Sequence, residues 1–327
     1  MKVLITGAAG FIGSTLALKL LERGDEVVGI DNLNDYYDVN LKKARLERVK
    51  VHKGFTFHQL NIADKDAILA LAPSLGDVTH IVNLAAQAGV RYSLTNPYAY
   101  VETNVMGMVV MMELGRLLPK LEQYVYASSS SVYGGNTKSP FSVEDPVEKP
   151  ISLYAATKRC DELMAYTYAH LYKMPCTGLR FFTVYGPWGR PDMAAYLFAT
   201  NIIAGKPIPV FNNGNMRRDF TYIDDIVAGV VGVIDNPMKP AEGQVLTRVY
   251  NIGNSQTETL MDYIGEIEKA LGKKAIYDFL PMQPGDVPET FADIEATKRD
   301  FAYDPKTTIR EGIPNFIAWY KKYHNIG

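Results

Sequence analysis

The glycine-rich turn near the N-terminus restricts the possible folds more than any other feature of this sequence. Lys2–Thr6 is a short apolar run that predicts a buried parallel strand, and Gly7, Gly10 and Gly13 follow it directly. Residues 14–23 then have the apolar spacing of an amphipathic helix. Glycines at this spacing allow a tight turn, a close approach of the backbone to a pyrophosphate, and packing of the helix on the strand. The helix N-terminus presents unpaired N–H groups to the phosphates, so the stretch predicts a dinucleotide-binding unit.

The second predicted strand, Glu26–Ile30, ends at an acidic residue, Asp31. A carboxylate at this place accepts hydrogen bonds from the adenosine ribose and repels a 2′-phosphate, which favours NAD over NADP. The segment from Asn32 to Glu47 is a polar and aromatic insertion with a basic helical piece. We interpret it either as a solvated surface loop or as a cover over the cofactor, and the residues alone favour neither.

Strand and helix patterns alternate along the first half of the chain and predict an α/β fold, a Rossmann doubly wound parallel sheet. The further strands are expected at residues 55–60, 80–84, 123–127 and 177–182, and the main helices at 103–117 and 154–172. After residue 182 the alternation loosens, which indicates a smaller C-terminal α/β lobe. We expect residues 1–182, with about 219–252, to form the NAD-binding domain, and residues 183–218 and 253–327 to form a substrate-binding lobe.

Composition excludes several classes of partner. The chain is 47% hydrophobic and 21% charged, with a net charge of −2, which is typical of a globular protein that binds neither nucleic acid nor an anionic membrane. Its two cysteines, Cys160 and Cys176, lack metal-ligand spacing, so we expect reduced thiols and no metal site. No signal peptide is recognised, and the apolar run at residues 226–234 is too short to span a bilayer. We therefore expect a soluble, cytoplasmic protein.

Tyr154 and Lys158 carry the predicted chemistry. They are four residues apart, so on a helix they lie on one face. A free phenol has a pKa of about 10, and a neighbouring ammonium lowers the pKa of a phenol, which makes tyrosine a usable base. The run from Ser128 to Ser131 lies upstream and can place a hydroxyl beside the phenol. A Tyr-x-x-x-Lys pair is common on solvated helices, so its weight comes from the dinucleotide-binding frame around it.

These motifs together resemble the extended short-chain dehydrogenase/reductase family of nucleotide-sugar-modifying enzymes, and the resemblance covers nearly the whole chain. Four stretches, residues 32–37, 86–92, 180–193 and 283–290, are more specifically similar to UDP-glucuronate 4-epimerases. The resemblance implies a Rossmann domain with tightly held NAD and a C-terminal lobe that grips a UDP-sugar. It also implies a homodimer formed through two helices of each subunit.

Carried over residue by residue, the resemblance makes Ser129, Tyr154 and Lys158 the catalytic residues. It implies cofactor contacts from Tyr154, Lys158, Gly7, Gly10, Phe11, Ile12, Gly13, Asp31, Asn32, Asn61, Ile62, Leu84, Ala85, Ala86 and Asn104. It implies substrate contacts from Gln87, Arg91, Ser129, Ser130, Ser131, Thr183, Arg190, Phe211, Arg218, Gln283 and Asp286.

Individual substrate roles follow from the same resemblance. Arg218 matches the diphosphate-binding arginine, Phe211 the residue beside uracil, and Asp286 a contact of the UDP ribose. We expect Arg190 to hold the sugar carboxylate, because a guanidinium binds a carboxylate through two parallel hydrogen bonds, with Arg91 as the second candidate. Galactose-type epimerases have arginine where this chain has Gln283, so the diphosphate depends more on Arg218.

The expected reaction is inversion of carbon 4 of UDP-glucuronate, giving UDP-galacturonate through a 4-keto intermediate with bound NAD. Related alternatives are a UDP-glucose/UDP-galactose 4-epimerase and a UDP-glucuronate decarboxylase. Dehydratases and decarboxylases of the superfamily tend to carry an acid where this chain has Ser131, and a serine is a poor proton donor to a leaving group. A non-catalytic NAD-sensing module is a third alternative, disfavoured because such a protein would be expected to lose Tyr154 or Lys158.

Overall fold

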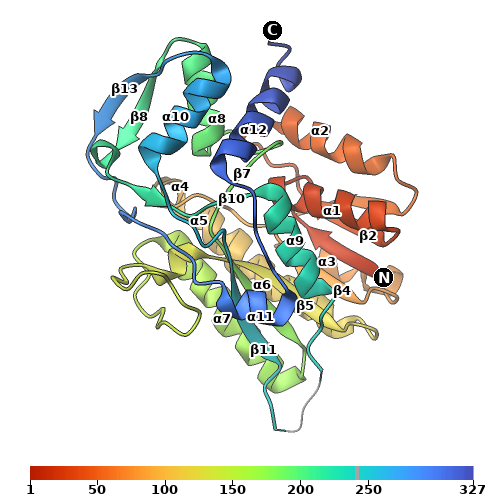
Figure 1. The fold of residues 1–327 in the computed structure, drawn as a ribbon. Helices are drawn as coiled ribbons and strands as arrows, with labels where there is room; N and C mark the ends of the chain where they lie inside the picture. Colours follow the sequence, from red (N-terminus) through yellow and green to blue (C-terminus); the bar gives the residue numbers. More distant parts are fainter. Residues whose placement is uncertain (240–242, 327) are drawn as a thin grey trace.

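The centre of the molecule is a sheet of seven strands in the order β11-β6-β5-β4-β1-β2-β3 (Figure 1). The computed structural model describes residues 1–239 and 243–326. All neighbouring strands of the sheet are parallel, which confirms the predicted doubly wound α/β fold. The strands are β1 Lys2–Thr6, β2 Glu26–Asp31, β3 Phe55–Gln59, β4 His80–Asn83, β5 Gln123–Ser129, β6 Cys176–Phe181 and β11 Thr247–Ile252. The strand order reverses between β1 and β4, where such sheets bind their ligands.

Helices cover both faces of this sheet. In β1, Val3 and Ile5 contribute to one hydrophobic core with side chains of α1 and α9, whereas Leu4 contributes to a second core with side chains of α3, α6 and α7. This alternation follows from the two-residue period of a strand buried on both faces. The helices are α1 Phe11–Arg23, α2 Val39–Lys50, α3 Lys65–Leu69, α4 Tyr92–Thr95, α5 Pro97–Tyr100, α6 Gly107–Leu117, α7 Leu153–Tyr172 and α9 Ile223–Ile234.

Local signals explain where the functional helix α7 begins and ends. Ser152 caps it, because its Oγ accepts a hydrogen bond from the backbone N–H of Ala155 at 3.1 Å. Lys173 follows in the left-handed conformation and ends the helix. The helix predicted at residues 103–117 differs from expectation, since a π-helical segment, Val101–Met106, precedes α6. Inserted turns of this kind are frequent near functional sites.

The second half of the chain builds a smaller lobe over the carboxyl edge of the sheet (Figure 1). Its strands form three two-stranded sheets: β7 Thr183–Tyr185 with β10 Phe220–Tyr222, β8 Pro207–Phe211 with β13 Ile276–Leu280, and β9 Arg217–Arg218 with β12 Glu258–Thr259. Its helices are α8 Ala194–Ile203, α10 Leu260–Leu271 and α12 Ile309–Tyr323.

One hydrophobic core runs from the first face of the main sheet into the lobe, so the two parts share packed side chains. The helix α11, Glu295–Phe301, belongs to the segment predicted as lobe, yet it packs on β11 and α9 beside the main sheet. The exact division into two domains therefore stays a prediction. Within the described residues, no helix is long and apolar enough to cross a membrane.

Candidate active site

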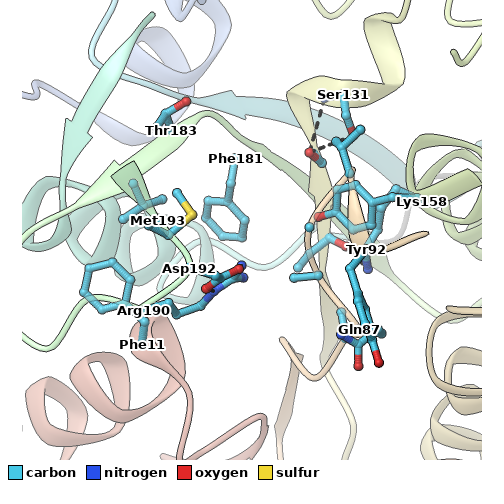
Figure 2. Close-up of a pocket in the computed structure, with 18 of the residues that line it drawn as sticks. Phe11, Gln87, Tyr92, Ser131, Lys158, Phe181, Thr183, Arg190, Asp192 and Met193 are labelled. Atoms are coloured by element: carbon cyan, nitrogen blue, oxygen red, sulfur yellow. Dashed lines mark hydrogen bonds and ion pairs between the residues drawn. The ribbon is translucent and has the colours of Figure 1, made fainter. Parts of the chain in front are cut away.

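A cavity of about 880 Å³ lies between the carboxyl edge of the main sheet and the lobe. Its size is that of a site for a cofactor or a large small-molecule ligand. Residues from the glycine turn, the ends of β2 to β6, helix α7 and the lobe line its wall. Figure 2 shows Lys158 and Ser131 on one side of this cavity and Arg190 and Asp192 on the other.

The glycine turn between β1 and α1 requires its glycines. Gly7 has a φ of 69°, and a Cβ placed on Gly10 would lie 2.9 Å from the Gly7 carbonyl oxygen. A Cβ on Gly13 would overlap the same carbonyl. The backbone N–H of Gly10 donates to this oxygen at 2.8 Å, which closes the turn at the helix N-terminus. The arrangement fits a pyrophosphate, as the sequence predicts.

Asp31 ends β2 beside this turn and is 9% exposed. Its Oδ2 accepts a hydrogen bond from the N–H of Ala9 at 3.0 Å, and its Oδ1 accepts one from Leu33 at 2.8 Å. A carboxylate has about four acceptor positions, so each oxygen keeps one for a ribose hydroxyl in the cavity. These free acceptor positions fit the ribose of NAD.

The insertion after Asp31 covers the cavity, which decides between its two interpretations. Asn34, Tyr36, Tyr37 and Lys42 line the wall. Arg45 is fully buried and joins the insertion to two other segments.

The guanidinium of Arg45 makes this connection without a carboxylate partner among residues 1–239 and 243–326. Nη1 donates to the Ala9 carbonyl at 3.2 Å and to the Tyr37 hydroxyl at 2.6 Å. Nε and Nη2 donate to the Trp188 carbonyl at 3.0 and 2.6 Å, and Nη2 also donates to Gly189 at 3.1 Å. Arg45 thus fixes the glycine turn relative to the loop that carries Arg190.

The three predicted catalytic residues reach the same cavity from β5 and α7. Ser129 Oγ accepts hydrogen bonds from the N–H and the hydroxyl of Ser131, at 3.2 and 2.9 Å. Lys158 is 4% exposed, and its Nζ donates to the Ala127 carbonyl at 2.9 Å and to Asp161 Oδ2 at 3.0 Å. Burial lowers the pKa of Lys158, but the Asp161 carboxylate and the Tyr154 phenol outweigh burial and raise it overall. Lys158 therefore stays charged at neutral pH.

A buried ion pair behind this wall holds α7 against β5 and β6. Glu162 accepts from Nε and Nη2 of Arg180 at 2.8 and 2.9 Å, and from the Ser128 hydroxyl at 2.7 Å. Burial raises the pKa of Glu162, yet hydrogen bonds and charge from Arg180 lower it overall. Sequence reasoning missed this pair, although an arginine inside an apolar strand was a usable signal. The pair fixes the serine run relative to Lys158.

The residues predicted to hold the nucleotide gather at the lobe side. The Arg91 guanidinium lies 4.1 Å from the centre of the Phe211 ring, and its Nη2 lies 2.9 Å from Asp286 Oδ2. Arg218 Nη1 donates to the carbonyls of Arg217 and Pro288 at 2.9 and 3.0 Å. Burial lowers the pKa of Arg218, partly offset by Asp286. The side chains thus form one polar end of the cavity.

Arg190 already holds a carboxylate that belongs to the chain. Its Nε and Nη2 donate to Asp192 at 3.0 and 2.5 Å, and the Tyr36 hydroxyl donates to the same carboxylate at 3.2 Å. The Nη1 group makes no hydrogen bond to the residues that the structure describes. Asp192 and Tyr36 were not among the residues predicted for this site. Asp192 was nevertheless visible two residues after Arg190.

Two predicted contacts do not reach the wall. Asn104 is 3% exposed. Its side-chain oxygen accepts a hydrogen bond from the Gln87 N–H at 2.8 Å. Its NH2 group donates to the Gln87 carbonyl at 3.1 Å and to the Thr157 hydroxyl at 3.0 Å. Its role in this structure is to shape the loop after β4, which places Gln87 in the wall. Gln283 lies before the Gly285–Asp286 turn, and only that turn lines the cavity.

The other predicted residues line the cavity, and their individual roles stay predictions. They are Phe11, Ile12, Asn32, Asn61, Ile62, Leu84, Ala85, Ala86, Gln87, Ser130 and Thr183. Within residues 1–239 and 243–326, no three histidine, cysteine or acidic side chains gather in a way that could hold a metal ion.

Comparison with known proteins agrees with this geometry. A family model described as the NAD dependent epimerase/dehydratase family matches residues 3–253. The chain is 45% identical over 335 residues to a probable UDP-glucuronate 4-epimerase of Rhizobium meliloti (strain 1021). The alignment covers 98% of this chain and 97% of the relative. It is 44% identical over 340 residues to UDP-glucuronate 4-epimerase 2 of Arabidopsis thaliana, which covers 100% of this chain and 77% of that protein.

A solved structure has the same fold along the whole chain. The UDP-glucuronic acid 4-epimerase of Bacillus cereus, in complex with UDP-glucuronic acid and NAD, matches with a TM-score of 0.90 at 34% identity. The match covers 99% of this chain and 100% of that one. Because the family model matches most of the chain and relatives align along its full length, this chain belongs to the NAD dependent epimerase/dehydratase family.

Proposed function

We propose that the protein is a NAD-dependent UDP-glucuronate 4-epimerase that interconverts UDP-glucuronate and UDP-galacturonate. The observation that carries this proposal is one cavity lined by Tyr154, Lys158 and Ser129 and also by an arginine, Arg190. Figure 2 shows Arg190 across the cavity from Lys158. The relatives named as UDP-glucuronate 4-epimerases, aligned over the full length of the chain, support the same substrate.

The residues near the N-terminus fit NAD. The turn from Gly7 to Gly13 would hold the pyrophosphate, and Asp31 would bind the adenosine ribose. When bound, NAD supplies the acceptor for the hydride of carbon 4 and the donor for its return.

The side chains of α7 and β5 would handle the proton. Tyr154 takes the proton of the 4-hydroxyl and later returns it to the same oxygen. Lys158 lies one helical turn further along α7 and supplies a positive charge beside this proposed base. Ser129 donates a hydrogen bond to the carbonyl that develops at carbon 4, which stabilises the charge on its oxygen. Because the proton returns to the oxygen from which it came, the reaction needs no net proton uptake.

Inversion requires that the sugar turn while the nucleotide stays bound. Arg218, Phe211 and Asp286 lie at the lobe end of the cavity and would fix the diphosphate, uracil and ribose. These contacts bind parts of the substrate far from carbon 4, so they hold the nucleotide without restraining the sugar ring. The 4-keto sugar can therefore present its other face for the returning hydride.

Arg190 supplies a reason for selectivity toward an acidic sugar. Its Nε and Nη2 edge holds Asp192, which leaves Nη1 for the substrate carboxylate. A 4-keto sugar with a carboxylate on carbon 5 is a β-keto acid and loses carbon dioxide when the breaking bond aligns with the carbonyl π system. A guanidinium that holds the carboxylate out of that alignment protects the intermediate.

The test is product analysis by NMR after incubation with UDP-glucuronate and, separately, with UDP-glucose. We expect UDP-galacturonate from the first and little product from the second. Release of a pentose nucleotide would make the protein a decarboxylase. Conversion of UDP-glucose alone would make it a neutral-sugar epimerase, and no conversion of either would contradict the proposal.

We also propose that the protein is a homodimer in which a second copy covers helix α7. Leu163, Tyr166 and Leu171 project from this helix with 54%, 52% and 59% of their surface exposed. Apolar side chains gathered on one long helix indicate an interface. We expect Leu163→Asp to yield monomers in light scattering, whereas Phe279→Asp, which changes an equally exposed lobe residue, leaves the dimer intact. The cytoplasmic location expected from the sequence stays a prediction.

A further inference from the structure

Lys158 has a carboxylate partner that the proposed chemistry does not use. Asp161 lies three residues further along α7, and its Oδ2 is 3.0 Å from Lys158 Nζ. Both side chains are buried, with exposed fractions of 4% for the lysine and 3% for the aspartate. An ammonium has three N–H groups, of which Ala127 and Asp161 take two. One N–H remains for a group in the cavity that Lys158 lines.

A purely structural role explains this ion pair poorly. Removing two charges from water costs free energy that their attraction offsets only when the other polar atoms are also satisfied. Asp161 Oδ1 is buried and has no hydrogen-bond partner among the described residues. Burial raises the pKa of Asp161 to about 6, with Lys158 acting in the opposite direction. The carboxylate is therefore retained at some cost to stability, next to the proposed catalytic lysine.

In the described part of the chain, the elements around Lys158 offer it no other free carboxylate. On α7, Glu162 is held by Arg180, and burial raises the pKa of Cys160. On β5, burial raises the pKa of Tyr124 and Tyr126 well above the ordinary value. On β6, burial likewise raises the pKa of Cys176, and Arg180 stays charged. The titratable groups that act on the pair directly are Tyr154, Cys160, Glu162, Tyr124 and Tyr126, and Cys176 and Arg180 lie behind them beside Tyr126.

We propose that Asp161 is a positioning residue that keeps Lys158 charged and fixed in the cavity wall, and thereby sets the alkaline limit of the epimerase reaction. The role of this pair in turnover rests on the proposed function. Asp161 acts through Lys158 and touches no reacting atom. Without the carboxylate, Lys158 would lose the largest influence that opposes burial, and it would release its proton at a lower pH.

The experiment compares the pH profile of kcat/KM for wild type and Asp161→Asn, which keeps an acceptor oxygen but removes the charge. An opposite charge at close range changes a pKa by about one to three units, so we expect the alkaline limb to move down by at least about one pH unit. Asp161→Glu should keep the limb near its wild-type position. The matched control is Glu295→Gln, which breaks the exposed Glu295–Lys298 pair of the same spacing and should leave the profile unchanged.

A second measurement does not depend on turnover. In protein with ¹³C-labelled lysine, the Lys158 signal, assigned with Lys158→Arg, should titrate at lower pH in Asp161→Asn than in wild type. An unchanged titration would overturn the proposal, even if activity or stability fell. Failure of UDP-glucuronate as a substrate would contradict the proposed function alone, and the NMR titration would still decide the role of Asp161.

Discussion

Two buried acids organise the two parts of the molecule, and they are satisfied in opposite ways. Glu162, beside the main sheet, faces the guanidinium of Arg180 and the Ser128 hydroxyl. Asp219, between the lobe strands β9 and β10, is fully buried and makes no ion pair with the residues that the structure describes. It accepts hydrogen bonds from the backbone N–H groups of Asn254, Ser255 and Ala292 at 2.7, 3.0 and 3.1 Å.

The difference appears in the titration of the two carboxyl groups. Burial acts to raise the pKa of both carboxyl groups, but Arg180 lowers the pKa of Glu162 overall. Burial raises the pKa of Asp219 to about 6, because neutral N–H groups stabilise its charge less than a guanidinium does. Beside the proposed catalytic residues, the Glu162 carboxylate is thus paired with a guanidinium. In the lobe, the Asp219 carboxylate instead joins separate backbone segments through their N–H groups. The proposed catalytic residues lie in the first region, whereas Arg190, proposed to hold the sugar carboxylate, follows the lobe strand β7.

The largest effect should come from the proposed base. Tyr154→Phe should lower kcat by about 10²–10⁴-fold, because a positioned base contributes that much, while the melting temperature and bound NAD stay near wild type. Steady-state kinetics measure kcat, and calorimetry measures the melting temperature. Tyr98→Phe, an 84% exposed position, is the control. A Tyr154→Phe enzyme that kept more than about a hundredth of the wild-type rate would remove the chemistry from this region.

Breaking the charge pair behind the serines should be the next largest effect. Glu162→Ala leaves the Arg180 charge buried and unpaired, which costs about 3–5 kcal/mol of unfolding free energy. Urea denaturation measures the loss. Glu47→Ala removes an exposed pair with Lys50, and it should cost less than about 1 kcal/mol. Equal losses for the two variants would show that Glu162 and Arg180 are not a central pair.

The effect of Asp219 should appear in the pH dependence of the free energy of unfolding. The folded pKa of Asp219 lies above its ordinary value of 3.8, so the folded chain holds a proton that the unfolded chain loses between about pH 4 and 6. The free energy of unfolding therefore falls as pH rises through this range. In Asp219→Asn this contribution disappears, so its stability relative to wild type should rise by on the order of 2 kcal/mol between pH 4 and pH 7.

The Glu162 site predicts the opposite sign, which makes the two acids a matched pair. Its folded pKa is lowered, so its contribution to stability is present at neutral pH and is lost as pH falls. Glu162→Gln should therefore lose stability relative to wild type as pH rises. Unfolding free energies relative to wild type, measured by denaturation at several pH values, that changed with pH in the same direction in Glu162→Gln and Asp219→Asn would contradict the comparison.

The smallest effect concerns the loop of Arg190. Arg190→Ala should raise KM for UDP-glucuronate by about tenfold or more, since a hydrogen bond to a charged group contributes about 1.5–3 kcal/mol. We also expect some decarboxylated 4-keto-pentose product, seen by NMR. Arg299→Ala, an exposed arginine paired with Asp300, is the control. Normal KM and no pentose product would leave Arg91 as the candidate for the carboxylate.

Features with a local cause could be predicted from the sequence. The turn of Gly7, Gly10 and Gly13, the acid at the end of β2, and the shared helix of Tyr154 and Lys158 depend on neighbours within one strand–turn–helix unit or one helical turn. The doubly wound sheet follows because buried parallel strands and amphipathic helices each have a readable period. These elements appear within a few residues of their predicted bounds.

Only the tertiary structure decided how the polar groups pair. Arg45 meets the Trp188 carbonyl 143 residues away, and Asp219 meets the Ala292 N–H 73 residues away. No period in the sequence encodes such contacts, because they depend on the paths of irregular loops. The amide of Asn104 likewise binds the backbone of Gln87, 17 residues away, and its predicted cofactor contact stays a prediction. The Arg190–Asp192 pair is the exception, because its two members are only two residues apart and it could have been read locally. The sequence determined which groups the protein has near its cavity, and the packing of distant loops determined which of them are free to act.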